Sequence, residues 1–450
     1  MKRKYKLNDD IRALNSVFRK NGYSLYVVGG AVRDYILSLH NDDYDFTTDA
    51  RPEEVIRMFA HHVIPTGLQH GTVTVRFRGQ SYEVTTFREE SGYSDSRHPD
   101  SVSFVRSLES DLERRDFTIN AFAADCEDGT IIDLHKGMED LKAGLIRAIG
   151  NPDERFREDA LRMLRAVRFA SKLGFTIEDE TFKAIQRAAH TILSVSWERI
   201  REELFKIIAS DHPALGIETM RKAGLLHYVL PELEACINVT QGPLHHSDVY
   251  THSLETLEMA REHSYPFFVR LAALLHDIAK PQCRKESAEG ITFYNHDREG
   301  AAAADAIMLR LKCSNEERSR VTALVLNHMF CYTPEWSDGA VKRFVIRVRK
   351  ENLDGLFSLR IADATAIDRN ADLSLLWQLE ERIEKLESAQ EAMSLKDLAV
   401  NGQDLKNAGI SPGPVMGKTL AWLLEKVLDQ PELNTKAELL RLAAEFTQRL

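Results

Sequence analysis

Apolar residues follow two different patterns along the chain, with a change near residue 150. Before it, short β-branched or alternating runs predict strands, at VTVRF (73–77) and YEVTTF (82–87). From Pro152 onward, apolar residues recur at helical spacing, which predicts successive amphipathic helices. These helices are expected over 152–175, 181–193 and 198–210. The pattern therefore predicts an α+β fold, with an α/β head followed by an elongated all-α region.

Turn-rich segments divide the helical part of the chain. NVTQGPLHHSD (238–248) separates two helical blocks, and Asn401-Gly402 with Pro412-Gly413-Pro414 mark a small tail. A chain of 450 residues is also longer than one hydrophobic core normally serves. We predict four domains. They are a head (1–150), a helical neck (151–237), a helical body (238–390) and a tail (391–450).

The net charge of −10 argues mildly against a protein that is coated with nucleic acid. It leaves room for a local basic surface, because recognition depends on where the charges lie. The candidate is VKRFVIRVRK (341–350), which holds five basic residues and no acid. This segment is either a nucleic-acid surface or an ordinary solvated helix face.

Cysteine usage and hydropathy bear on the compartment. The five cysteines are scattered without a CxxC pair, which favours reduced thiols. The start, MKRKYKLNDD, lacks the apolar core of a signal peptide, and no apolar run approaches the roughly 18 residues that span a bilayer. We therefore expect a cytoplasmic protein with no membrane partner. No feature of the sequence indicates an oligomeric state.

The richest chemistry lies in YVVGGAVRDYILSLHNDDYDFTT (26–48). An apolar run ends in Gly29-Gly30, a turn where a phosphate can approach backbone N–H groups, and a helix-like run follows. Asp43 and Asp45 are separated by one residue, so on a strand both carboxylates would share a face. Adjacent like charges are costly unless a cation lies between them. This arrangement predicts a two-metal nucleotidyl-transfer site.

This combination resembles the head of the nucleotidyltransferase superfamily, in the branch of class II tRNA nucleotidyltransferases (CCA-adding enzymes) and bacterial poly(A) polymerases. The resemblance implies that Glu83 is a third catalytic carboxylate beside two Mg²⁺ ions, although an exposed strand glutamate is the alternative. It also implies that Gly29, Gly30 and Arg33 bind the triphosphate side of the nucleotide. His70, in GLQHGTVTV (67–75), is as consistent with a structural as with a functional role.

DLERRDFTINAFA (111–123) carries a second matching motif. Arg114 and Arg115 could offer guanidinium groups to a triphosphate or ribose. Alternation along a strand would let only one of them face the site, and we favour Arg115. Asp116 and Asn120 could hydrogen-bond a ribose hydroxyl or order the strand.

EDALRMLRAVRF (158–169) is the most discriminating segment. If it is one helix, Asp159 and Arg162 lie on neighbouring surface positions, and the i+3 stepping continues through Arg165 and Arg168. Standing alone, this would be a surface ion pair of little energetic value. Behind a metal-binding head, it resembles the motif that selects the incoming base without a template.

The chemistry of that selection follows from the Watson–Crick edges. Asp159 would accept from an exocyclic amine, and Arg162 would donate to the neighbouring ring nitrogen. Cytosine and adenine present an amine beside an acceptor, whereas uracil and guanine present a carbonyl beside an N–H. Buried polar partners reject a mismatched ligand strongly, so CTP and ATP would be accepted and UTP and GTP refused.

A separate group of histidines and aspartates lies within residues 245–366. His276-Asp277 lies within an apolar helix, where an unpaired charge is expensive and a metal would satisfy it. The set resembles HD-type metal phosphohydrolases, which implies a divalent metal held by His252, His276, Asp277 and Asp363. His296 and His328 would allow a second metal. The alternative is an inactive HD fold kept as scaffold.

Taken together, the resemblance implies a template-independent tRNA 3′-end nucleotidyltransferase that adds C, C and A from CTP and ATP and releases pyrophosphate. It also implies that the tail contacts tRNA and that the HD-type body could hydrolyse phosphate esters. A full-length segment at 88–108 disfavours CC-only activity, and the short end after the tail disfavours a poly(A) polymerase. Two alternatives stay open: an A-adding enzyme with a CC-adding partner, and an HD metal phosphohydrolase acting on nucleotides or RNA ends.

Overall fold

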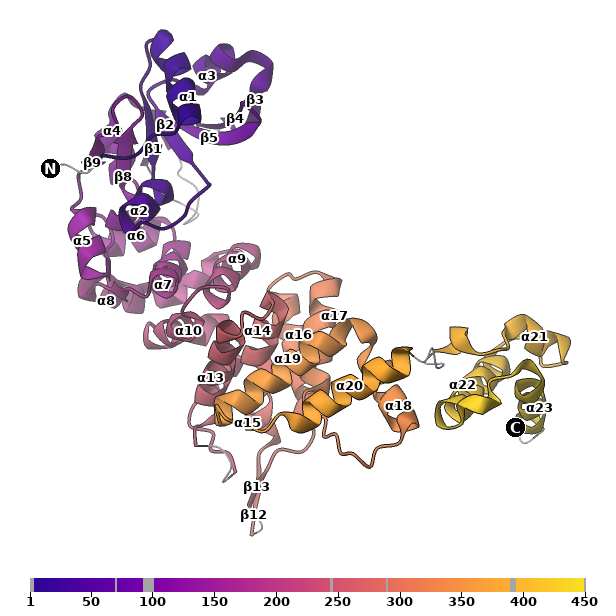
Figure 1. Cartoon of the computed structure of the whole chain (residues 1–450). Coiled ribbons are helices and arrows are strands. Elements are labelled where there is room, and N and C mark those ends of the chain that lie inside the picture. The colour runs from indigo at the N-terminus through magenta and orange to yellow at the C-terminus, as the bar shows by residue number, and fades with distance from the viewer. Residues whose placement is uncertain are drawn as a thin grey trace. The chain divides into compact units, whose positions relative to one another are not determined.

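The computed structural model describes residues 4–68, 71–91, 101–242, 246–288, 290–388 and 394–448. The chain forms two compact units, Met1–Glu234 and Ala235–Leu450 (Figure 1). Their division lies close to the predicted boundary after residue 237. The finer division into head, neck, body and tail stays a prediction. His70 lies outside the described residues.

A seven-stranded mixed sheet forms the first part of unit 1, in the order β3-β4-β5-β2-β1-β8-β9. The strands are β1 (Leu25–Val28), β2 (Asp45–Thr48), β3 (Val63–Gly67), β4 (Thr72–Phe77), β5 (Gln80–Thr86), β8 (Phe122–Asp125) and β9 (Ile131–Asp133). β2 and β5 pair in parallel, and the other neighbours pair antiparallel. The strands predicted at 73–77 and 82–87 are therefore confirmed as β4 and β5.

Short helices and two-stranded pairs complete the sheet region. The helices are α1 (Asp9–Lys20), α2 (Gly30–Leu37), α3 (Pro52–Phe59), α4 (Leu108–Glu113) and α5 (Gly137–Ala143), with 3₁₀ turns η1 (Ala60–His62) and η3 (Thr118–Asn120). The small pairs are β6 (Arg88–Ser91) with β7 (Ser101–Phe104), and β10 (Leu145–Ile146) with β11 (Thr176–Ile177). The predicted α/β head is confirmed.

The rest of unit 1 is helical, as predicted. It holds α6 (Pro152–Glu158), α7 (Leu161–Leu173), α8 (Asp179–Ala188), η4 (Ala189–Ser194), α9 (Trp197–Ile208), α10 (Pro213–Lys222), α11 (Leu226–Val229) and α12 (Pro231–Glu234). The stripe of Leu161, Leu164 and Val167 on α7 is buried, as expected of a core face.

The expectation of a single helix over 152–175 is wrong, because the helix is interrupted at Asp159 and two helices form instead. The backbone of Asp159 is extended (φ −146°, ψ 106°), which ends α6. Its carboxylate then accepts a hydrogen bond from the backbone N–H of Leu161 at 3.0 Å, at the start of α7. Aspartate favours such helix starts, because its side chain satisfies an N–H that has no partner within the helix.

Unit 2 is built almost wholly of helices. They are α13 (Val249–Glu262), α14 (Phe267–Leu275), α15 (Lys280–Cys283), α16 (His296–Arg310), α17 (Asn315–Asn327), α18 (Asp338–Val348), α19 (Lys350–Ile367), α20 (Ser374–Ser388), α21 (Gly402–Asn407), α22 (Pro414–Asp429) and α23 (Lys436–Thr447). Between α15 and α16 stands the hairpin of β12 (Lys285–Ser287) and β13 (Gly290–Thr292), which projects from the helices (Figure 1). Two 3₁₀ turns, η5 (Leu395–Asp397) and η6 (Pro431–Leu433), lie near α21 and α23.

In the basic segment 341–350, Lys342 and Arg343 take part in packing, whereas Arg347, Arg349 and Lys350 are exposed. Lys342 is fully buried and donates to the carbonyl oxygen of Leu428 at 3.3 Å, at the end of α22. Arg343 pairs with Asp429 at 2.9 Å, also on α22. These contacts join α18 to α22. The prediction of a nucleic-acid surface is therefore wrong for Lys342 and Arg343, and a solvated helix face does not describe them either.

The cysteines and the hydropathy agree with the sequence. All five cysteines are free thiols, and three of them are buried. Among the described residues, no helix combines the length and apolar character needed to cross a membrane.

Gly137, at the start of α5, tests how tightly the sheet region is packed. A Cβ there would lie 2.3 Å from the carbonyl oxygen of Thr118 and 2.7 Å from Cζ of Phe122. Gly137→Ala should therefore lower the free energy of unfolding by about 1–3 kcal/mol, because a backbone atom cannot yield cheaply. Chemical denaturation measures the change. Gly417→Ala, on α22 with open space around it, is the matched control and should be neutral or slightly stabilising; equal losses in both variants would contradict the packing.

Candidate functional site

An open cavity of about 990 Å³ lies in unit 1. We call it the unit 1 cavity. It is lined by residues from the sheet, from η3 and from the helices α2, α7 and α9. Within the described part of unit 1, every residue that the sequence nominated lines it, namely Gly29, Gly30, Arg33, Asp43, Asp45, Glu83, Arg115, Asp116, Asn120, Asp159, Arg162, Arg165 and Arg168. The structure thus brings the nominated residues together, and their individual roles stay predictions.

Three carboxylates gather on the sheet side of the cavity. The parallel register of β2 and β5 sets Asp45 directly beside Glu83. Asp43 precedes β2 instead of lying on it, so the expected strand alternation is not what aligns it with Asp45, yet both line the cavity. Desolvation raises the pKa of Asp45 above its usual value, and the charges of Asp43 and Glu83 raise it further.

This accumulation of negative charge fits a divalent cation. Oxygen ligands are what Mg²⁺ prefers, and a cation among Asp43, Asp45 and Glu83 would relieve their mutual repulsion. The cavity is also open enough to admit a nucleotide beside the ion.

The glycine turn gives the cavity a surface without side chains. Gly29 has φ +68°, a conformation that L side chains rarely adopt. A Cβ at Gly29 would also lie 3.1 Å from Nη1 of Arg115, so the guanidinium packs against bare backbone. Arg33, one turn into α2, is buried and donates to Asp34 at 2.8 Å and to Asn120 at 2.6 Å.

Both arginines of the second motif face the cavity, which corrects the expected alternation. The segment is the end of α4 and a turn, not a strand, so period-2 geometry does not apply. Asp111, which is fully buried, lies between them: Arg114 donates to it at 2.7 Å, and Arg115 lies 3.6 Å from its other oxygen. Thr47 of β2 also donates to this carboxylate at 3.3 Å. Asp111 was not foreseen from the sequence.

Asp116 is the centre of a second charge network. Arg165 donates to its carboxylate at 2.8 Å, and Asn120 donates to its other oxygen at 3.4 Å. Burial disfavours the charged carboxylate, but the charge and hydrogen bonds of Arg165 outweigh it and hold the pKa of Asp116 at about 2. Because Asn120 in turn binds Arg33, this network links α7 to η3 and α2.

Asp159 and Arg162 have different partners from those the sequence suggested. Arg199 of α9 donates to Asp159 at 2.8 Å, whereas Arg162 pairs with Glu158 and donates to the carbonyl oxygen of Arg155 at 3.1 Å. Glu158 could have been noticed beside Asp159. Arg199 could not, because its only signal is a position on a helix forty residues away.

Arg168, the last basic residue of the i+3 series, pairs with the buried Glu203 of α9 at 3.1 Å. The pKa of Arg168 is lowered by burial, which Glu203 partly opposes. Together with Arg199, this contact fixes α7 and α9 against each other.

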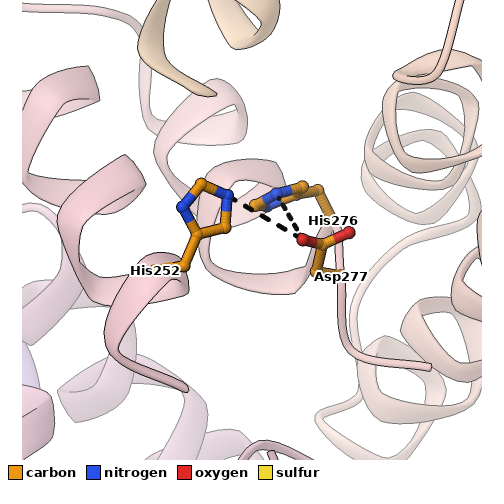
Figure 2. Close-up of side chains that lie close together, drawn as sticks. All are labelled: His252, His276 and Asp277. Carbon is orange, nitrogen blue, oxygen red and sulfur yellow. Dashed lines mark ion pairs between the residues drawn. The ribbon is translucent and has the colours of Figure 1, made fainter. Parts of the chain in front are cut away.

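A second cluster lies in unit 2. We call it the histidine–aspartate cluster, and its members come from five helices and their ends: His252, His276, Asp277, His296, His328 and Asp363. In Figure 2, His252 and His276 point toward the carboxylate of Asp277. All the metal ligands predicted for the HD-type site are therefore buried close together.

The cluster has two halves that share Asp277. Around Oδ2 lie His276 Nε2 at 3.2 Å and His252 Nε2 at 3.8 Å, and His252 also contacts Asp363 at 3.0 Å. Around Oδ1 lie His296 Nε2 at 3.4 Å and His328 Nε2 at 3.6 Å. Each half forms a group whose ligand atoms could hold one ion.

The histidines are oriented as metal ligands. Nδ1 of His276, His296 and His328 lies 2.7–2.8 Å from a backbone carbonyl oxygen, which can only accept a hydrogen bond. In the neutral ring this leaves the lone pair on Nε2, turned toward Asp277. These three Nε2 atoms and Oδ1 of Asp277 are buried without a hydrogen-bond partner. Such unsatisfied polar atoms fit a divalent metal.

Arg165→Met tests the Asp116 network. It leaves a buried carboxylate without its main partner and should cost about 3 kcal/mol of unfolding free energy at neutral pH. In the wild type, the folded pKa of Asp116 is about 2, below the ordinary aspartate pKa of 3.8. The stability that this shift contributes is therefore fully present above pH 3.8 and is lost as the pH falls toward 2. Denaturation at several pH values should show the difference between variant and wild type narrowing in acid; a constant difference would contradict it.

Comparison with known proteins gives consistent similarities along the chain. Residues 25–147 match the poly A polymerase head domain, 174–237 the RNA- and SrmB-binding site of polymerase A, and 286–443 the tRNA nucleotidyltransferase domain 2. The CCA-adding enzyme of Latilactobacillus sakei is 39% identical over 94% of both chains. That of Limosilactobacillus reuteri is 36% identical over 95% of this chain and 94% of its own.

Solved structures agree with these relatives. The Bacillus stearothermophilus CCA-adding enzyme, solved in complex with CTP, superposes with a TM-score of 0.75 at 28% identity. The match covers 98% of this chain and 97% of that one. The similarity therefore extends over both units.

Proposed function

The chain belongs to the CCA-adding enzyme family, and we propose that it adds C, C and A to the 3′ end of tRNA from CTP and ATP with the residues of the unit 1 cavity. Full-length similarity to CCA-adding enzymes carries the activity. The relatives do not favour an A-adding-only enzyme or a phosphohydrolase as the main function. The observation that supports the residue roles is one cavity lined by three carboxylates and by the guanidinium groups of α7 and α9.

Nucleotide transfer would take place at Asp43, Asp45 and Glu83. The family uses divalent metals, and we propose Mg²⁺ here, which would activate the tRNA 3′-hydroxyl and neutralise the triphosphate. The chain's own part is to hold the reacting groups in line and to balance their charge. The backbone of Gly29 and Gly30 would let the triphosphate come close, while Arg115 would contact it from the rim.

Base selection would depend on Asp159 and Arg162. Asp159 offers carboxylate oxygens to an exocyclic amine, and Arg162 offers N–H groups to a ring acceptor, so a pyrimidine or purine with the opposite pattern leaves both unpaired. Arg199 and Glu158 would hold these two side chains at the angle at which they meet the base. Arg165 and Arg168 would line the same face of α7 beside the nucleotide, where their ion pairs with Asp116 and Glu203 hold them in place.

The histidine–aspartate cluster supports a second, separate site. We propose that it is an HD-type site that holds divalent metal at His252, His276, Asp277 and Asp363, with His296 and His328 available for another ion. The metal would polarise a phosphate ester and supply an activated water. The buried, unpartnered Nε2 atoms are the observation that favours it.

The remaining proposals concern partners and compartment. The tail (391–450) would contact tRNA together with the helices of the neck, and the enzyme would act in the cytoplasm, where free thiols stay reduced.

The activity is tested on labelled tRNA transcripts that end at the discriminator base or at CC. With Mg²⁺, CTP and ATP, the first should gain three nucleotides and the second one. Asp45→Asn should reduce addition by at least about a hundredfold, because removing one metal-binding charge removes transition-state stabilisation. His276→Ala, in the other unit, is the control and should add nucleotides at the wild-type rate. Extension of the CC transcript alone would contradict CCA addition, and full activity in Asp45→Asn would contradict the metal site.

Arg199→Leu tests the support of base selection. Asp159 would lose its guanidinium partner, so incorporation of UTP relative to CTP should rise about tenfold or more, while CTP incorporation falls less. The matched control is Arg187→Leu, which removes an exposed arginine paired with Asp153 on the neighbouring helix α6. Unchanged selectivity in Arg199→Leu, or an equal change in Arg187→Leu, would show that Arg199 does not position Asp159.

A further inference from the structure

Lys280 is the one lysine that enters the histidine–aspartate cluster among the described residues. It begins α15, three residues after Asp277, and is almost fully buried. Its Nζ lies 2.6 Å from Oδ2 of Asp277 and donates to Oε1 of Gln241, also at 2.6 Å. The same ammonium lies 5.5 Å from the centre of the Phe293 ring. A flexible cationic side chain is thus fixed on three sides.

Lys280 contacts the same carboxylate oxygen that a metal in this half of the cluster would need. Oδ2 of Asp277 is also the oxygen that His276 and His252 approach. A cation held by these groups would need that oxygen, which Lys280 already neutralises. The other acid of this half, Asp363, is paired with Arg360 at 2.7 Å. Two carboxylates are therefore balanced by two fixed positive charges.

The other half of the cluster lacks this compensation. Oδ1 of Asp277 has no hydrogen-bond partner, and its neighbours are the Nε2 atoms of His296 and His328. The two halves share one carboxylate but differ in local charge. A lysine therefore opposes an incoming dication in one half only.

We propose that Lys280 is an internal counter-ion which a divalent metal must displace from Asp277, so that it sets the affinity of that half of the site. The proposal rests on the metal site put forward above. Breaking the Lys280–Asp277 pair costs free energy that is subtracted from metal binding, and the ammonium then repels the ion at short range.

The displaced ammonium would also determine which kind of ligand the metal-loaded site binds, namely an anion. Gln241 and Phe293 contact Lys280 independently of Asp277, so they would keep Nζ beside the site after a metal had displaced it from the carboxylate. A fixed ammonium next to a dication binds an anion, and phosphate is the anion that fits the proposed hydrolysis of phosphate esters.

The test is calorimetric titration of the full-length chain with Mn²⁺, in an Asp45→Asn background that removes the site of unit 1. The weaker of the two Mn²⁺ binding steps belongs to the half that Lys280 neutralises, and in Lys280→Met it should become at least about tenfold tighter than in the parent, because a repelling charge is gone. Its melting temperature should fall without metal and rise more steeply with Mn²⁺, because the bare carboxylate is then paired by the ion. Lys285→Met, on the exposed strand β12, is the matched control and should leave both unchanged.

Three outcomes separate the inference from the metal site it rests on. If the parent binds Mn²⁺ but Lys280→Met binds it equally or more weakly, the inference is overturned. If neither protein binds Mn²⁺ and His276→Ala changes nothing, the proposed metal site itself fails. Should Lys280→Met not fold without metal, Gln241→Leu loosens the same lysine and should raise the affinity by a smaller factor, whereas no rise would overturn the inference.

The anion is tested with inorganic phosphate on the Mn²⁺-loaded proteins. Phosphate should bind Lys280→Met at least about fivefold more weakly than the parent, since one charged donor is lost. Lys285→Met should bind phosphate like the parent. Equal phosphate affinity in Lys280→Met and the parent would contradict the role of Lys280 in binding an anion. The Mn²⁺ titration tests its role as a counter-ion separately.

Discussion

The parallel pairing of β2 with β5 is the constraint on which the unit 1 cavity depends. It is the one parallel pair of the seven-stranded sheet, and it sets Asp45 level with Glu83. Two carboxylates at that spacing repel each other, and Asp43 adds a third charge. Such an arrangement is stable only if bound cations or nearby positive side chains neutralise the carboxylates. The chain supplies arginines around the cavity and leaves space in it for a metal ion.

The same rule organises the surrounding shell. Three of the acids that hold arginines of the cavity are buried: Asp111 between Arg114 and Arg115, Asp116 against Arg165, and Glu203 against Arg168. A buried charge that loses its partner is expensive, so these pairs fix the orientation of the guanidinium groups more than they add stability. In unit 2, the buried Asp277 is likewise paired with a positive side chain, Lys280, at one oxygen, whereas its other oxygen has no hydrogen-bond partner.

Sequence reasoning nominated residues that the structure brings together in each unit, but it did not predict which of them pair with each other. Glycine turns, strand patterns and motif spacing locate Gly29, Asp45 and His276, because these signals are local or belong to a recognisable order along the chain. The interruption of the helix at Asp159 was missed, because the spacing of apolar residues does not reveal a single residue with a non-helical backbone. Arg199 and Asp111 were missed because their partners are set by packing between helices, or between a helix and the sheet. The roles of Lys342 and Arg343 in the basic segment were missed for the same reason, since these two charges join α18 to α22.

The most direct test of the account is a crystal structure of the chain with Mn²⁺ and a non-hydrolysable CTP analogue, with the anomalous signal used to locate the metal. The account predicts an anomalous peak in contact with Asp43 and Asp45, close to the analogue's triphosphate, and the cytosine edge within hydrogen-bond distance of Asp159 and Arg162. A peak away from these carboxylates, or a cytosine that contacts neither residue, would contradict the assignment of the cavity.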